Sequence, residues 1–138
     1  MNVIRFTIPG KPNAWQRSGQ NGKFHFTPKE TVQFQNCVKL FFCQAAPDWQ
    51  PHEGPVTMDV RSFFEVPKSW SAKKRAATIG RPVMCSKPDW DNLGKNISDA
   101  LNGIAYRDDA QVYDGRVSKQ YTDGAPRTEV IIIFEDAA

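Results

Sequence analysis

The sequence predicts an α+β fold, a single compact domain in which a mostly antiparallel sheet packs against helices. Short segments near both ends and in the middle of the chain alternate apolar and polar residues, as half-buried strands do. Between them lie segments with apolar residues at helical spacing. The length of 138 residues suits one domain, and no repeat or linker divides it, so we expect residues 1–138 to fold as one unit.

The N-terminal segment predicts a strand and then a hairpin arm. Residues 3–8 alternate apolar and polar side chains and stop at Pro9-Gly10, which indicates a first strand. A loop follows, with a strong turn cluster at residues 18–22. Residues 23–26 after this turn are a possible arm of a hairpin.

A long helix is predicted next. Thr27, Pro28 and Glu30 form the pattern of an N-cap, a proline in the first helical position and a capping-box glutamate. Apolar residues then recur at a spacing that buries one broad stripe. We expect this helix to run from Pro28 to about Ala46, with Pro47 ending it.

The middle of the chain predicts a strand and a short basic helix. Residues 56–66 read as a long strand closed by Pro67. Ser69 or Ser71 then stands where a helix cap is expected, before the cations at residues 73–75.

A second helix is predicted from Asp89 or Asp91 to Gly103. Its apolar residues fall on one face, which we expect to be buried: Leu93, Ile97, Ala100, Leu101 and Ile104. Polar residues occupy the opposite face, where Asp91 and Lys95 are neighbours one turn apart. After this helix, residues 112–121 and 128–135 predict a closing pair of strands joined by a turn at Asp123-Gly124.

Composition narrows the class of protein. Hydrophobic residues make up 40% and charged residues 24%, and the net charge of +3 permits binding to a polyanion. No apolar run approaches the roughly 18 residues of a membrane span, and the N-terminus lacks a signal-peptide core. Cys37, Cys43 and Cys85 form no pair pattern, so we expect reduced thiols in a cytoplasmic protein without membrane attachment.

The chemistry concentrates between Asp89 and Asp109. Asp89 and Asp91 lie at the mouth of the second helix, Lys95 follows four residues after Asp91, and Asp108-Asp109 comes after the helix. One interpretation is structural, since aspartates cap helices and form turns. The other is that Asp89, Asp91 and one of Asp108 and Asp109 supply hard oxygen ligands to Mg²⁺. A metal site in a basic chain favours a phosphodiester substrate.

Other motifs are excluded by their spacing. The segment from Asp89 begins like an EF-hand loop, but Leu93 and Ala100 stand where calcium ligands are required. No phosphate-binding loop of a nucleotide enzyme occurs, so we expect no nucleotide cofactor. His25 and His52 are too few and too far apart for a zinc site.

The ordered block DWDNLGKNISDALNG, followed by DDAQV, resembles the RusA family of Holliday-junction resolvases. The opening strand with its proline-rich turn, the helix at Thr27-Pro28 and the closing strands also resemble that family, so the likeness covers nearly the whole chain. It implies a RusA-like fold and a crossover junction endodeoxyribonuclease. Such enzymes are homodimers, depend on Mg²⁺ with Mn²⁺ as a substitute, and cut paired strands of four-way DNA junctions in recombination and repair. They are often carried by phages and prophages.

The resemblance also implies roles for residues. The metal ligands would fall on Asp89, Asp91 and Asp109, and the essential lysine on Lys95, which together form the catalytic set. Asp99 matches a structural or supporting aspartate. The chain departs from the family pattern at Trp90, where an aliphatic residue is usual, and at residues 85–88, which carry fewer arginines.

DNA contacts are expected from clustered cations, because lysine and arginine neutralise phosphates. The grouped candidates are Arg17, Lys23, Lys73, Lys74, Arg75 and Lys87. Three tryptophans, Trp15, Trp70 and Trp90, are candidates for stacking on bases or for packing. Two alternatives to a junction resolvase stay open: a nuclease that tolerates flaps and other branched DNA, and a non-catalytic DNA-binding protein whose aspartates only cap a helix.

Overall fold

A four-stranded sheet forms the centre of the molecule. The computed structural model describes residues 1–16, 19–21, 24–26, 28–84 and 87–138. The strands lie in the order β1 (Asn2–Pro9), β6 (Arg127–Phe134), β4 (Val56–Glu65) and β5 (Val112–Thr122). The pairs β1–β6 and β6–β4 are antiparallel, and the pair β4–β5 is parallel. The sheet is therefore mixed but mostly antiparallel, as predicted.

The predicted hairpin of the last two strands is wrong. β5 and β6 do not pair, because β4 lies between them and bonds to both. Their connection, residues 123–126, crosses two strand spacings, about 10 Å, whereas a two-residue turn joins adjacent strands only. β6 holds an inner position, where both of its neighbours bond to it, and its second half, Val130–Phe134, is apolar on both faces. The polar β5 lies at the edge.

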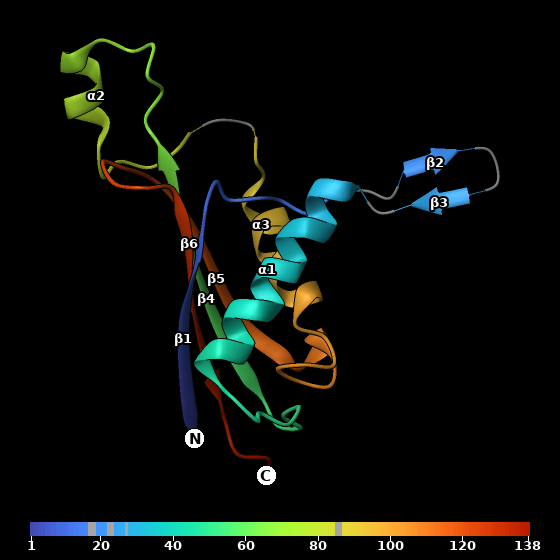
Figure 1. The fold of residues 1–138 in the computed structure, drawn as a ribbon. Coiled ribbons are helices and arrows are strands. Elements are labelled where there is room, and N and C mark those ends of the chain that lie inside the picture. The colour runs from blue at the N-terminus through green and yellow to red at the C-terminus, as the bar shows by residue number, and fades with distance from the viewer. Residues whose placement is uncertain (17–18, 22–23, 27, 85–86) are drawn as a thin grey trace.

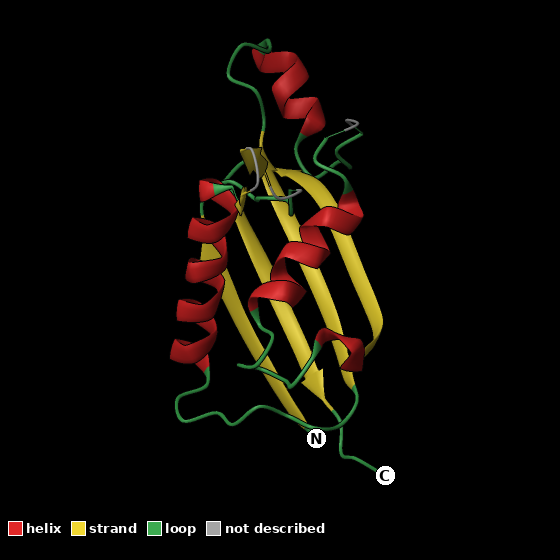
Figure 2. Ribbon diagram, turned by 90° about the vertical axis from the view of Figure 1, so that its right-hand side faces the viewer, coloured by secondary structure: helices red, strands yellow, loops and turns green. Residues whose placement is uncertain are grey.

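Two helices cover one face of the sheet. α1 (Lys29–Ala45) and α3 (Trp90–Ala100) both lie in front of the strands in Figure 2. The large core cluster combines inward residues of β1, β4 and β6 with those of the helices, among them Phe6, Val38, Phe42, Val60, Ile97, Ile132 and Phe134. Strands β1, β4 and β6 alternate between buried and more exposed positions, so the opposite face of the sheet carries no helix.

The first predicted helix is confirmed with a shifted start. α1 begins at Lys29, and Pro28 occupies the capping position, where its carbonyl accepts a hydrogen bond from Val32 N at 3.1 Å. The predicted cap, Thr27, lies outside the described residues. The helix ends at Ala45, one residue before the predicted end at about Ala46.

Two smaller elements project from this body. The hairpin of β2 (Gly19–Asn21) and β3 (Phe24–Phe26) confirms the predicted hairpin arm. The short helix α2 (Ala72–Thr78) is capped by Ser71, whose Oγ accepts from Lys74 N at 3.2 Å. Figure 1 shows α2 beyond the end of the sheet. Among the described residues, no helix combines the length and apolarity that crossing a bilayer requires.

Candidate active site

α3 is fixed by a buried stripe and by a polar anchor. Four of its predicted inward residues are almost fully buried: Leu93, Ile97, Ala100 and Leu101. The fifth, Ile104, lies beyond the end of the helix and is only partly buried. Asn96 is also fully buried, and its Nδ2 donates to Asn13 O and Asn13 Oδ1 at 3.0 and 3.1 Å. Its Oδ1 accepts from Gln35 Nε2 at 2.9 Å. Asn96 therefore ties the middle of α3 to α1 and to the loop after β1.

The aspartates at the start of α3 are not engaged as helix caps. Asp89 holds the N-cap position, but its carboxylate accepts no capping hydrogen bond. Among the residues that the structure describes, Asp91 Oδ1 accepts from the adjacent Asn92 N alone, at 3.0 Å. A capping aspartate normally accepts from an amide two or three residues ahead. The purely structural interpretation of these two carboxylates therefore lacks the bonds that it requires.

Asp91, Lys95 and Asp109 line one cleft. This cleft has a volume of about 380 Å³ and lies between α3, the 3-10 turn η1 (Asp109–Gln111) and strands β4 and β5. Trp90 borders it and is 61% exposed. Three of the four predicted catalytic residues thus come together, although Asp91 and Asp109 are 18 residues apart in sequence.

Asp89 lies on the other side of the helix start. It lines a neighbouring cavity of about 600 Å³ together with Lys11, Trp15 and Lys87. In this structure Asp89 and Asp91 therefore line different cavities. The reason is that successive residues at a helix start point in different directions, about 100° apart per residue.

The structure separates the roles of the two adjacent aspartates in η1. Asp108 forms a capping box: its side chain accepts from Gln111 N, while Asp108 N donates to Gln111 Oε1 at 3.0 Å. Asp109 uses only its backbone for local support, donating its N–H to Asn102 Oδ1 at 2.7 Å. Gln111 Nε2 donates further to His52 O, which secures the turn to the body. The carboxylate of Asp109 lines the cleft and contacts the Asp99 carboxyl.

The sequence suggested that Lys95 is the neighbour of Asp91, but in the structure Lys95 pairs with Asp99. Its Nζ lies 3.8 Å from Asp99 Oδ2 and 4.8 Å from the centre of the Trp15 ring. Burial raises the pKa of the Asp99 carboxyl, and its hydrogen-bonding contact with the Asp109 carboxyl raises it further, whereas Lys95 lowers it. Two carboxylates in contact repel each other when both are ionised, and a cation beside them relieves that repulsion.

The donors suit a magnesium ion without forming a closed cage. Among residues 1–16, 19–21, 24–26, 28–84 and 87–138, no three His, Cys, Asp or Glu side chains are grouped closely enough to enclose a metal. Magnesium usually takes one or two carboxylates and keeps waters or substrate phosphates as its other ligands. The carboxylates of Asp91 and Asp109 in one cleft meet that requirement.

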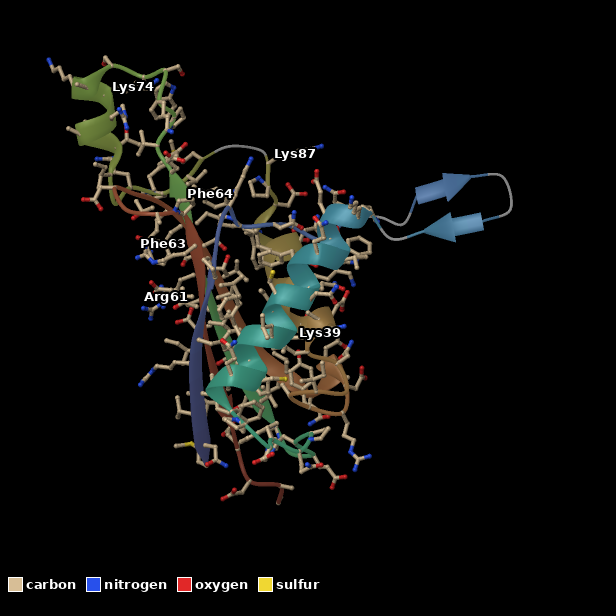
Figure 3. All side chains as sticks on the ribbon, viewed as in Figure 1. Lys39, Arg61, Phe63, Phe64, Lys74 and Lys87 are labelled. Carbon is tan, nitrogen blue, oxygen red and sulfur yellow. The ribbon has the colours of Figure 1, made fainter. Side chains whose placement is uncertain are left out.

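The predicted DNA contacts are distributed around this site. Lys73, Lys74 and Arg75 are exposed on α2, where Lys74 Nζ lies 3.9 Å from the centre of the Trp70 ring. Lys74 and Lys87 are labelled in Figure 3, near α2 and above the start of α3 respectively. Lys87 is exposed beside Asp89. The predicted contacts Arg17 and Lys23 lie outside the described residues.

Several residues of the site escaped the sequence analysis. Asn102 and Gln111 position η1, and Asn96 anchors α3, but an asparagine or glutamine carries no spacing signal of its own. Arg116, on β5, lines the cleft opposite α3 and was not among the predicted DNA contacts. Residues 112–121 were predicted to form a strand, but the sequence did not show which strand pairs with it. Without that pairing, Arg116 could not be placed beside the cleft.

Two comparisons with known proteins cover these residues. The family model described as Endodeoxyribonuclease RusA matches residues 9–133. The uncharacterized protein YqaN of Bacillus subtilis strain 168 is 42% identical over 139 residues, with 96% of each chain covered. The matched range of the family model includes both cavities around the start of α3.

Proposed function

Since this chain belongs to the RusA endodeoxyribonuclease family, we propose that it is a Mg²⁺-dependent nuclease that resolves four-way DNA junctions by paired nicks. The observation that carries this proposal is the cleft in which Asp91, Asp109 and Lys95 meet. Oxygen ligands for a metal and a cation for phosphate are the parts that phosphodiester hydrolysis needs.

Asp91 and Asp109 would hold the metal, with Asp89 available from the neighbouring turn. When bound, Mg²⁺, or Mn²⁺ in its place, supplies Lewis-acid polarisation of the scissile phosphate. Asp89 has no capping bond to lose, so rotation of its side chain toward the cleft would cost little. The contact between Asp99 and Asp109 supports the same assignment, because bringing a cation to these carboxylates offsets their repulsion.

Lys95 would stabilise the phosphate as it reacts. Its Nζ is held over the Trp15 ring and near Asp99, and it lines the cleft beside the proposed metal ligands. An ammonium group in that place donates to a nonbridging phosphate oxygen and offsets the negative charge that develops there. The contacts on both sides of the lysine fix its direction before DNA arrives.

Branched DNA and a homodimer are part of the proposal. Paired nicks on symmetry-related strands require two active sites, and a two-fold dimer supplies them with one interface. The exposed cations of α2 and Lys87 would contact the DNA arms. A cytoplasmic location accords with these partners.

A non-catalytic DNA-binding protein is the less favoured alternative. Such a protein gains nothing from carboxylates that line a cleft and repel phosphate, and neither Asp89 nor Asp91 makes the bonds of a helix cap. A nuclease that tolerates flaps would use the same cleft, so only the choice of substrate distinguishes it from a resolvase.

The experiment uses four-way junction, flap and linear DNA of equal length, labelled on each strand in turn. We expect cleavage of the junction with Mg²⁺ or Mn²⁺ and none with a chelator, and the nicks should map to opposite strands. A mixed dimer with one Asp91→Asn subunit should nick a single strand. Equal cleavage of flap and junction at every salt concentration would replace the resolvase with the tolerant nuclease, and no cleavage of any DNA would refute the proposal.

A further inference from the structure

Arg116 stands at a boundary between two cavities. It is exposed on β5, the edge strand beside the candidate active site. On one side it lines the cleft of Asp91, Lys95 and Asp109. On the other it lines a groove of about 460 Å³ with Asp59, Arg61, Phe63 and Lys119.

This groove lies on the face of the sheet that carries no helix. Figure 3 shows the side chains of Arg61 and Phe63 on the side of the sheet away from α1 and α3. The cleft, by contrast, lies between the sheet and α3. Arg116 therefore connects the helix-covered side of the molecule with its open side, around the edge of the sheet.

The edge of the sheet is covered only in part. The segment after α2 bonds to β5 through Gly80 N to Tyr121 O at 2.9 Å and Val83 N to Lys119 O at 3.1 Å. The backbone bonds that the structure describes between these segments end at Lys119, which is three residues away from Arg116 along β5. Arg116 lies farther along this edge, where it lines both the cleft and the groove.

The charges of the groove favour an anion. Its lining includes Arg61 and Arg116 against one carboxylate, Asp59. Lys119 also lines the groove, but its Nζ donates to Pro88 O at 2.8 Å. Asp59 already pairs with Arg61, with 3.2 Å between Asp59 Oδ2 and Arg61 Nη2. Arg116 forms no ion pair within 4.0 Å with any residue that the structure describes. A polyanion that leaves the acidic cleft thus meets an unneutralised guanidinium at the point of exit.

We propose that Arg116 binds a backbone phosphate of the DNA strand as it leaves the active-site cleft, and that the groove beyond it, with Arg61, receives the continuing strand. A guanidinium suits this position because its forked N–H donors bind two oxygens of one phosphate. The inference rests on the proposed nuclease function and adds to it a path for DNA across the sheet edge.

The chain offers a matched control for this arginine. Arg5 is exposed on β1, the opposite edge of the same sheet. The strand registers place Arg5, Ile131, Asp59 and Arg116 in one row across the sheet. Arg5→Gln and Arg116→Gln therefore remove the same charge from equivalent edges, of which only one borders the cleft.

The test measures binding of a labelled four-way junction in chelator, over a fourfold range of salt. Each phosphate contact contributes about 0.9 to the slope of log K against log salt, so Arg116→Gln should flatten the slope by about 0.9. Its relative loss of affinity should accordingly be about 3.5-fold larger at the low-salt end than at the high-salt end. Arg5→Gln should keep the wild-type slope, and Arg116→Lys should keep the slope while binding more weakly.

A second variant tests the groove itself. Asp59→Asn removes the carboxylate that neutralises Arg61, so it should tighten junction binding and steepen the salt dependence. If Arg116→Gln kept the wild-type slope while its circular dichroism matched the wild type, the inference would be wrong. Failure of the wild-type protein and Arg5→Gln to bind junction DNA at all would instead count against the proposed function.

Discussion

A single added methyl group at Gly94 tests how closely α3 approaches the sheet. Gly94 lies in the second turn of α3, between Asp91 and Lys95, and lines the cleft. A Cβ built there would lie 2.8 Å from Val117 Cγ2 on β5. At an open helical position Gly→Ala stabilises a protein by about 1 kcal/mol, because glycine is a poor helix former. The structure predicts the opposite outcome for Gly94→Ala.

The magnitude follows from this contact. Ordinary van der Waals contacts begin at 3.4 Å, so helix or strand must move apart by about 0.6 Å. Overpacking of this kind costs about 1–3 kcal/mol, which leaves a net destabilisation of about 0–2 kcal/mol after the helix gain. The same movement separates Asp91 and Lys95 from Asp109 across the cleft. Because a displacement of 1 Å can cost about 100-fold in rate, we expect a loss on the order of tenfold in cleavage.

The assay combines urea unfolding with single-turnover cleavage of a four-way junction. Val117→Ala removes the methyl group that clashes, so Gly94→Ala/Val117→Ala should be more stable than the sum of the single changes by about 1 kcal/mol and should regain part of the lost rate. Gly124→Ala is the control, since its Cβ would meet Thr122 Oγ1 at an ordinary 3.6 Å. If Gly94→Ala were about 1 kcal/mol more stable than the wild type and cut at the wild-type rate, the close approach would not exist.

Three further predictions concern the charged residues of the cleft. Asp109→Asn should abolish cleavage while junction binding stays intact or tightens, because the change removes both a metal ligand and a charge that repels phosphate. Asp108→Asn alters only the capping box and should retain most of the cleavage. Equal losses in the two variants would contradict the separation of their roles. Lys95→Ala should lower the single-turnover cleavage rate by about 100-fold, which corresponds to an increase of about 3 kcal/mol in the barrier. Loss of the ion pair with Asp99 alone would change the free energy of unfolding by only about 0.3–0.5 kcal/mol. A fall in rate of less than about threefold would favour a structural role for Lys95. The pKa of Asp99 is raised by burial and by Asp109, so its contribution to the stability of the metal-free protein is present below its unfolded pKa and is lost as pH rises through its folded pKa. Asp99→Asn should therefore raise the melting temperature of the metal-free protein at neutral pH and flatten its decline with pH above the acidic range, as differential scanning calorimetry in chelator would measure.

The elements of this fold follow from local patterns. The apolar spacing predicted a buried stripe of Leu93, Ile97, Ala100, Leu101 and Ile104; the first four are buried, and Ile104 is partly buried. Alternation identified the four long strands, and Ser71 capped α2 as one of two predicted candidates. Such patterns are sufficient because each element buries its own face, and the period of its side chains records which face that is.

The sequence by itself also predicted which residues carry the chemistry, since a spaced set of aspartates and one lysine resembles a known nuclease motif. Only the tertiary structure decided how they meet. The insertion of β4 between β5 and β6 and the meeting of Asp91 with Asp109 in one cleft depend on neighbours far away in the chain. Arg116 gains its place beside the cleft in the same way, through the pairing of β5 with β4. Contacts between distant segments leave no period in the sequence, because the geometry of the whole sheet and its helices sets them.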